Sequence, residues 1–187
     1  MEELLSLIAA RTTVGPDLEQ AITDAFQVEQ FAEGDMLLSE DRYCRKLYFI
    51  QSGMARTFHY HDGKDVSTWF YDRGHFLTSW YGFLKQQPSL ESIEVVEDLQ
   101  ALTITFERYN QLVEGHLDFE RFTRRLMEDQ IAFLEYFYQG FMFLSAKEKY
   151  DQLLQHFPDI TLRVKLGHIA SFLGITQETL SRIRKQR

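Results

Sequence analysis

The sequence has one cysteine, three prolines and ten glycines among its 187 residues. A single cysteine excludes an intrachain disulfide, a four-cysteine zinc site and an all-cysteine iron–sulfur cluster. We expect Cys44 to be a buried structural thiol, with redox sensing as the alternative. The shortage of proline and glycine argues against low-complexity linkers, so most of the chain should be folded.

Long hydrophobic runs and a secretory signal are also lacking. No stretch approaches the roughly 18 apolar residues that span a bilayer, and Met1 to Thr12 lacks the basic start and cleavage site of a signal peptide. We find no glycine-rich phosphate loop, nucleophile elbow or paired-carboxylate constellation. We therefore expect a cytoplasmic protein that is not an enzyme, with no catalytic residue, no metal ligand and no cofactor.

Positive charge is scarce overall but concentrated at one end. The formal net charge is -8. Residues 1–145 carry 12 Lys and Arg against 24 Asp and Glu, whereas residues 146–187 carry 8 against 4. An acidic body with a basic tip is what local attraction to phosphate requires. The alternative reading is a solvated basic tail.

Most of the first 105 residues show the period of β-strands. Helical spacing appears only over 2–10 and 17–26, and from 28 to 105 the period changes to two. The alternating runs are 46–51, 54–60, 65–71 and 99–105, and turn signals such as Ser52-Gly53 separate them. Short strands at this spacing predict an antiparallel barrel or sandwich. The apolar segment from Phe76 to Gln86 should cap one opening.

Residues 117–144 predict one long helix, on the order of 40 Å at about 1.5 Å per residue. Its second half is apolar nearly all round, which demands burial on more than one side. We expect one side to meet the barrel and the other to form a twofold dimer seam. The expected interface residues are Leu126, Gln130, Phe133, Phe137 and Phe141. An internal core helix is the alternative.

Two further helices should follow a short connector. Ser145 and Glu148 have the spacing of a capping box, and this helix should end near Pro158. Residues 165–185 then have the spacing of a helix-turn-helix: Gly174 suits the sharp turn, and Thr176 is a good N-cap for the last helix. The inner faces are Leu166, Ile169, Ala170 and Leu173, then Thr179, Leu180 and Ile183.

The outward face of the last helix carries groups that can read bases. The expected base-contacting residues are Gln177, Glu178, Ser181 and Arg182. An arginine can contact guanine with two hydrogen bonds, a glutamine can read adenine, and a glutamate can accept from cytosine. The expected phosphate-contacting residues are Lys165, Thr176, Lys185 and Arg187.

A barrel, a long helix and the run Ile-Thr-Gln-Glu-Thr-Leu-Ser-Arg-Ile at 175–183 resemble the Crp/Fnr family of bacterial transcription regulators. The similarity spans nearly the whole chain and is most specific over 165–185. It implies an α+β fold: a cyclic-nucleotide-binding-type β-roll over 1–115, a dimerisation helix over 116–144 and a helix-turn-helix domain over 145–187 that lacks a full β-wing. It further implies double-stranded DNA as partner, a homodimer, contact with RNA polymerase, and base-contacting positions at Gln177, Glu178 and Arg182.

The resemblance fails where cyclic AMP would bind. Members that bind it place a Gly-Glu pair for the ribose and an Arg-Ser/Thr-Ala run for the phosphate. The matching segments here are 74–79 and 88–91, with a hydroxyl in place of the carboxylate and no arginine, while Glu91 and Glu94 would repel an anion. We therefore do not expect cyclic AMP. The candidate pocket for another effector is Phe76, Leu77, Thr78, Ser79, Trp80 and Ser89.

Two other functions compete with this one. His59 and His61 on one strand face could share a metal in a cupin-like barrel enzyme, but a later Glu and His are not located, and His61-Asp-Gly-Lys64 reads as a hairpin loop. Surface histidines are the simpler reading. A partner-binding barrel that does not touch DNA is the third hypothesis, and it predicts no salt-dependent binding to any duplex.

Overall fold

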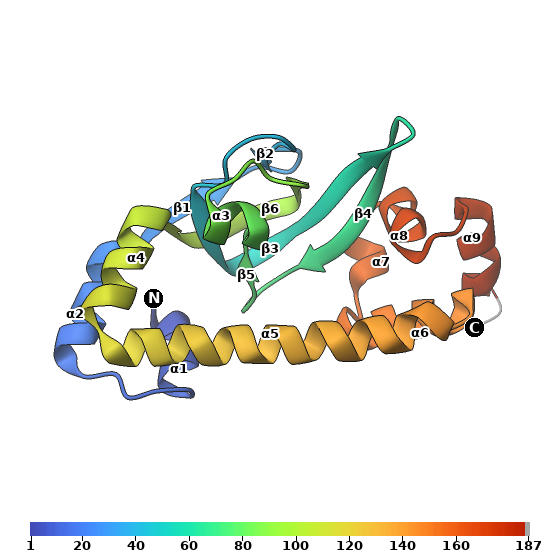
Figure 1. Ribbon diagram of the computed structural model, residues 1–187. Helices are drawn as coiled ribbons and strands as arrows, with labels where there is room; N and C mark the ends of the chain where they lie inside the picture. The colour runs from blue at the N-terminus through green and yellow to red at the C-terminus, as the bar shows by residue number, and fades with distance from the viewer. Residues whose placement is uncertain (186–187) are drawn as a thin grey trace.

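The structure is a computed structural model that describes residues 1–185 (Figure 1). Two N-terminal helices precede a six-stranded sheet, and further helices complete the chain. The helices are α1 (Glu2–Ala9), α2 (Pro16–Ala25), α3 (Trp80–Lys85), α4 (Phe106–Gly115), α5 (Leu117–Phe143), α6 (Ala146–His156), α7 (Ile160–Arg163), α8 (Leu166–Leu173) and α9 (Gln177–Lys185). The strands are β1 (Gln27–Phe31), β2 (Met36–Leu38), β3 (Lys46–His61), β4 (Lys64–Tyr71), β5 (Phe76–Leu77) and β6 (Ser92–Thr105).

The sheet is antiparallel, with the order β1-β6-β3-β4, while β2 pairs with β6 and β5 with β3. The long strands β3 and β6 pair along most of their length, from Lys46 opposite Thr105 to Phe58 opposite Ser92. The helices from α4 onward follow this sheet, so the predicted α+β architecture is confirmed.

The turn predicted at Ser52-Gly53 is wrong. Both residues lie inside β3, where the pairing with β6 shifts register around them. Gly53 has φ of +85°, and a Cβ at this position would lie 2.1 Å from the carbonyl oxygen of Asp98. Glycine is therefore needed for a bulge that bends one continuous strand, and its local signal is the same as that of a turn.

The side chains form two hydrophobic clusters. The first fills the roll between the sheet and the helices α1, α2, α4 and the first half of α5, and includes Phe49, Phe83 and Phe119. The second lies on the outer face of the β3–β4 hairpin, where Met54 and Phe70 pack against the second half of α5 and the helices α6 to α9. Figure 1 shows α5 running beneath the sheet, from α4 at one end to the C-terminal helices at the other.

The residues of α5 that were predicted to form the dimer interface pack largely within their own subunit. Leu126 packs into the first cluster and Phe137 into the second, with Phe133 and Phe141 partly buried beside it, and Gln130 is half-buried. Trp69 of β4 contacts Phe137, and Phe172 of α8 contacts Phe141. These positions therefore fit the core-helix alternative. A different row of apolar residues stays exposed on α5: Ile131, Leu134, Tyr138 and Met142.

Two smaller expectations concern Cys44 and membrane spans. The Cys44 side chain is buried, as expected, with its sulfur 3.1 Å from the hydroxyl of Thr78. None of the helices within residues 1–185 combines the length and the apolar character that crossing a bilayer would require.

Candidate nucleic-acid interface

The two helices α8 and α9 are joined by a tight turn that the local sequence dictates. Gly174 ends α8 with φ of +67°, a left-handed conformation that glycine adopts without steric cost. The Ile175 amide donates to the carbonyl of Ala170 (3.0 Å), and the Thr176 hydroxyl accepts from the amide of Thr179 (3.2 Å). These bonds satisfy groups that helix ends leave open, so the turn angle is fixed.

Burial divides α9 into an inner and an outer face. Leu180 and Ile183 are buried in the second cluster, whereas Gln177, Glu178 and Arg182 are exposed and Ser181 is half-buried. The predicted base-contacting residues therefore share the face turned away from the core. The Arg182 side chain lies along the helix, with its guanidinium 3.5 Å from the Glu178 carbonyl and 3.4 Å from the Thr179 hydroxyl.

Glu178 is ionised at neutral pH. Its own backbone amide and the Thr176 hydroxyl lower its pKa, and the nearby charge of Arg182 adds to the effect. A carboxylate in the first turn of a helix is also stabilised by the helix dipole. Glu178 can therefore serve as a hydrogen-bond acceptor on this surface.

The predicted phosphate-contacting residues have differing surroundings. Lys185 is exposed, whereas the Thr176 hydroxyl already caps α9. Lys165 is exposed and pairs with Glu33 of the β-roll at 3.8 Å. Arg187 lies outside the described residues.

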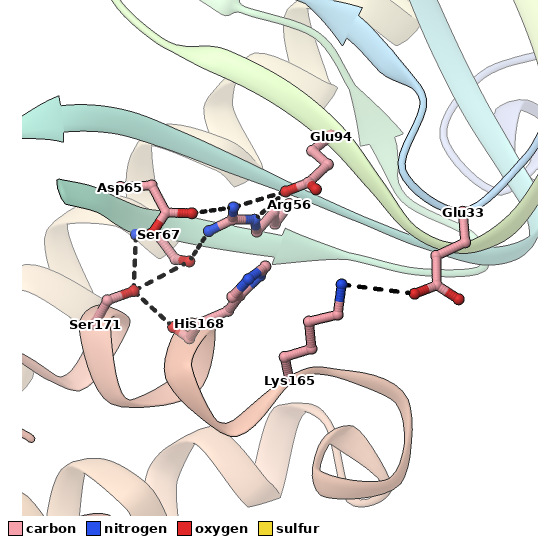
Figure 2. A network of polar contacts seen from close by, with 8 residues as sticks. All are labelled: Glu33, Arg56, Asp65, Ser67, Glu94, Lys165, His168 and Ser171. Atoms are coloured by element: carbon pink, nitrogen blue, oxygen red, sulfur yellow. Dashed lines mark hydrogen bonds and ion pairs between the residues drawn. The ribbon is translucent and has the colours of Figure 1, made fainter. Parts of the chain in front are cut away.

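Helix α8 packs against the β3–β4 hairpin through a polar network that the sequence did not reveal (Figure 2). The buried guanidinium of Arg56 donates to Glu94 (2.7 Å) and to Ser67 (2.9 Å), and it also bonds Asp65. The Ser171 hydroxyl accepts from the amide of Ser67 (3.1 Å), which ties α8 to β4. Ser67 and Ser171 lie 104 residues apart in the sequence, so no local pattern could indicate this hydrogen bond.

Charges within this network shift two pKa values. Burial opposes the ionisation of Asp65, but the hydrogen bond and charge of Arg56 outweigh it and lower the pKa. Burial lowers the pKa of His168, and the charge of Arg56 lowers it further, against the opposing carboxylates of Glu94 and Asp65. His168 is therefore held neutral beside a paired arginine.

An aromatic cluster surrounds Trp69 on the same face of the hairpin. The indole ring makes edge contacts with Phe137 of α5 at 4.8 Å, with Phe157 after α6 at 6.0 Å and with Phe172 of α8 at 5.6 Å. Such contacts stabilise beyond the area that they bury. Strand β4, the long helix and the helix-turn-helix thus meet in the second cluster.

The candidate effector residues are committed to the interior of the roll. Thr78 donates to the Lys46 carbonyl (2.9 Å), and the hydroxyls of Ser79 and Ser89 are 2.8 Å apart. Phe76 and Trp80 line an apolar void of about 10 Å³, which is close to the minimum that admits one water. Leu77 is fully buried. An effector of any size would have to displace these contacts.

Glu91 is half-buried, at the segment matched to the phosphate site. Burial raises its pKa, while hydrogen bonds from Thr68 and Thr57 oppose the rise. A partly buried carboxyl group at this place disfavours a negatively charged ligand.

The cupin alternative depends on His59 and His61. Both lie near the tip of the β3–β4 hairpin, and the His61 side chain is exposed. Among residues 1–185, no three His, Cys, Asp or Glu side chains gather as a metal site would require.

Taken together, these features define a class: a β-roll joined through a long helix to a helix-turn-helix. The family of cyclic nucleotide-binding domains matches residues 28–116. No curated protein sequence matches the chain significantly.

Solved structures match nearly the whole chain. A protein described as a Crp/Fnr transcriptional regulator from Eubacterium rectale is 17% identical, with a TM-score of 0.72 over 92% of this chain and 83% of its own. FixK2 from Bradyrhizobium japonicum is 19% identical, with a TM-score of 0.70 over 86% and 83%. The Thermus thermophilus catabolite activator protein is 18% identical, with a TM-score of 0.56 over 92% and 83%. The chain thus has the fold of these Crp/Fnr proteins, and residues 28–116 are similar to cyclic nucleotide-binding domains, which confirms the resemblance found in the sequence.

Proposed function

We propose that this protein is a cytoplasmic, sequence-specific DNA-binding transcription regulator that acts as a homodimer. The observation that carries the proposal is the division of α9: its apolar side is buried, while Gln177, Glu178 and Arg182 face outward together. A helix presented in this way by its predecessor fits the major groove. The fold of the Crp/Fnr regulators supports the same reading.

Each exposed group has a base edge that it suits. The Arg182 guanidinium can donate two bonds to guanine, the Gln177 amide can pair with adenine, and the Glu178 carboxylate can accept from the cytosine amino group. Ser181, half-buried between them, can donate or accept at close approach. Lys185, Lys165, Thr176 and Arg187 are proposed to contact phosphates, which set affinity and register.

The dimer seam is proposed on the exposed apolar row of α5. Ile131, Leu134, Tyr138 and Met142 recur at helical spacing and are each about half or more exposed. The row is displaced by one residue, about 100° around the helix, from the seam predicted at Leu126 to Phe141. Two copies packed along it would cover this surface by a twofold axis, and binding to two successive major grooves would need their α9 helices about 34 Å apart.

A charged side chain in the row should separate the subunits. Leu134→Glu is expected to shift sedimentation from dimer to monomer, because it would bury a carboxylate in an apolar seam. Tyr136→Glu is the matched control, since Tyr136 is also exposed but lies on another side of α5. Equal effects of the two changes would exclude this seam.

The β-roll is proposed to bias the spacing of the two α9 helices. A signal acts by binding one arrangement better than the other, and the segment from Phe76 to Ser89, which carries the candidate pocket residues, is where it would enter. Cyclic AMP is not the expected effector, because Glu91 occupies the phosphate region. RNA polymerase is the further partner that a regulator of this type would contact.

Selection of bound duplexes from a random pool, at stated salt, tests the function directly. The expected result is a nearly palindromic consensus whose half-sites lie one helical turn apart, with affinity that falls steeply as salt rises. If the protein binds duplexes without sequence preference, or binds no duplex, the roll would remain as a partner-binding module.

A further inference from the structure

Gly167 occupies a position where its backbone does not need glycine. It is the second residue of α8 and has ordinary helical geometry, without a positive φ. A glycine inside a helix costs about 1 kcal/mol relative to alanine. Some contact should therefore benefit from the missing side chain.

That contact is made by Gln177, the first residue of α9. A Cβ built on Gly167 would lie 2.8 Å from the Gln177 amide nitrogen and 3.6 Å from its carboxamide carbon. A Cβ atom does not approach other heavy atoms closer than about 3.0 Å without a shift, so alanine would displace this amide. Apart from the two chain neighbours of Gly167 and the nearby backbone of α8 itself, no other residue among those described has a heavy atom within 4 Å of the added Cβ.

The contact joins the two helix starts that would meet DNA. In a helix-turn-helix complex the first helix crosses the backbone and the N-terminal end of the second enters the groove. The Gln177 side chain is exposed, yet its amide rests against the first turn of α8. Its direction is therefore set by the space over Gly167 as well as by its own rotamers.

We propose that Gly167 is a specificity-determining residue that acts by positioning Gln177. The missing side chain lets the amide lie against α8, and this position fixes how the amide meets a base edge. Two parallel hydrogen bonds to adenine need both distance and angle, so a methyl group at 167 changes the base that Gln177 prefers. This inference rests on the function proposed above.

Four variants test the inference by selection from the random duplex pool. Gln177→Ala identifies the base pair that Gln177 reads. Gly167→Ala is expected to change the preference at that base pair by roughly fivefold, the lower limit for loss of a bidentate contact, and to leave the position read by Arg182 unchanged. In Gln177→Ala, the additional change Gly167→Ala should have no effect, because no amide is left to displace. Gly140→Ala is the matched control: it adds the same methyl group within helix α5, where the nearest neighbour is 4.0 Å away, and should leave every preference intact.

The experiment distinguishes failure of this inference from failure of the proposed function. If Gly167→Ala alters no base pair, or alters the same one equally when Gln177 is absent, Gly167 does not act through Gln177 and the inference is overturned. If the unchanged protein selects no sequence, the proposed function fails and the inference falls with it. Thermal unfolding guards against a folding defect: Gly167→Ala should melt no lower than the unchanged protein, because alanine favours the helix.

Discussion

The polar side chains of the β-roll and those of α9 differ in burial and in hydrogen bonding. Inside the roll, Thr78, Ser79 and Ser89 are buried and bonded to one another or to the backbone. On α9, Gln177 and Glu178 are exposed, and Glu178 is held by groups at the start of its own helix, its backbone amide and the Thr176 hydroxyl. The first set stabilises the fold, and the second remains available to a partner.

The network around Arg56 also stabilises the fold, although it lies between the β3–β4 hairpin and the helix-turn-helix. Its guanidinium is buried and bonded to three partners, so it has no donor turned toward solvent. Arg182 carries the same guanidinium in an exposed place. Surroundings, and not residue type, separate the structural Arg56 from the exposed Arg182 that we propose to read DNA.

The largest effect is expected from Arg56→Ala. Removing one member of a buried ion pair leaves carboxylates without compensation, at a cost of about 3 kcal/mol, the low end for buried pairs because Asp65 keeps some solvent access. Urea denaturation measures the loss. Arg121→Ala is the control, since its pair with Asp118 is exposed and should contribute less than about 1 kcal/mol. Equal losses would erase the distinction between buried and exposed arginines.

Arg182→Ala should do the reverse and leave stability almost unchanged. Specific DNA binding is expected to weaken by about 1–3 kcal/mol, with relaxed preference at one base pair per half-site. Competition titrations with consensus and scrambled duplexes measure both quantities. Lys185→Ala is the companion variant and should weaken all duplexes alike. An unaltered consensus with Arg182→Ala would remove this residue from the recognition surface.

Ser89→Ala should cost about 1–2 kcal/mol of stability, because its hydroxyl is a hydrogen-bond partner for Ser79 inside the roll. Ser181→Ala, on the half-buried side of α9, should change stability by no more than about 0.5 kcal/mol. Calorimetric unfolding of the two variants compares them directly. A stable Ser89→Ala protein would mean that the interior hydroxyls are not structural.

The smallest effect concerns pH and His168. Burial and the charge of Arg56 lower its pKa in the folded state, so below about pH 6.5 the unfolded chain takes up more protons. The free energy of unfolding should therefore fall as pH drops through that value. The groups that face this imidazole are Arg56, Asp65, Glu94 and Lys165.

His168→Gln removes the titrating group and should flatten the slope between about pH 7 and 5, by less than roughly 1.4 kcal/mol per pH unit. Denaturant unfolding across this range, for both proteins, gives the difference. Other groups, including Glu91, titrate in both proteins, so their contributions cancel. Identical slopes would show that His168 is not protected from protonation by the interface.

Local patterns predicted what local forces determine. The turn at Gly174 and the cap at Thr176 follow from backbone conformation and one hydrogen bond each, so the helix-turn-helix could be predicted residue by residue. The same is true of the capping box at Ser145, which the structure confirms.

Contacts between segments that are distant in the sequence could not be predicted from local patterns. The bulge at Gly53 carries the same local signal as a turn, and only its approach to Asp98 distinguishes them. Phe137 is equally apolar whether it packs on another subunit or on Trp69. The contact of Gly167 with Gln177 depends on the angle between two helices, which spacing alone does not define.

Trp69 is part of the sheet by sequence but packs with the C-terminal helices. A fragment that ends before α5 would retain β4 and lose the partners of this indole, Phe137, Phe157 and Phe172. Trp69 and the neighbouring Phe70 would then face water beside a β-hairpin, which is an aggregation hazard. The roll should therefore be expressed together with the C-terminal helices, and its indole fluorescence should report their undocking.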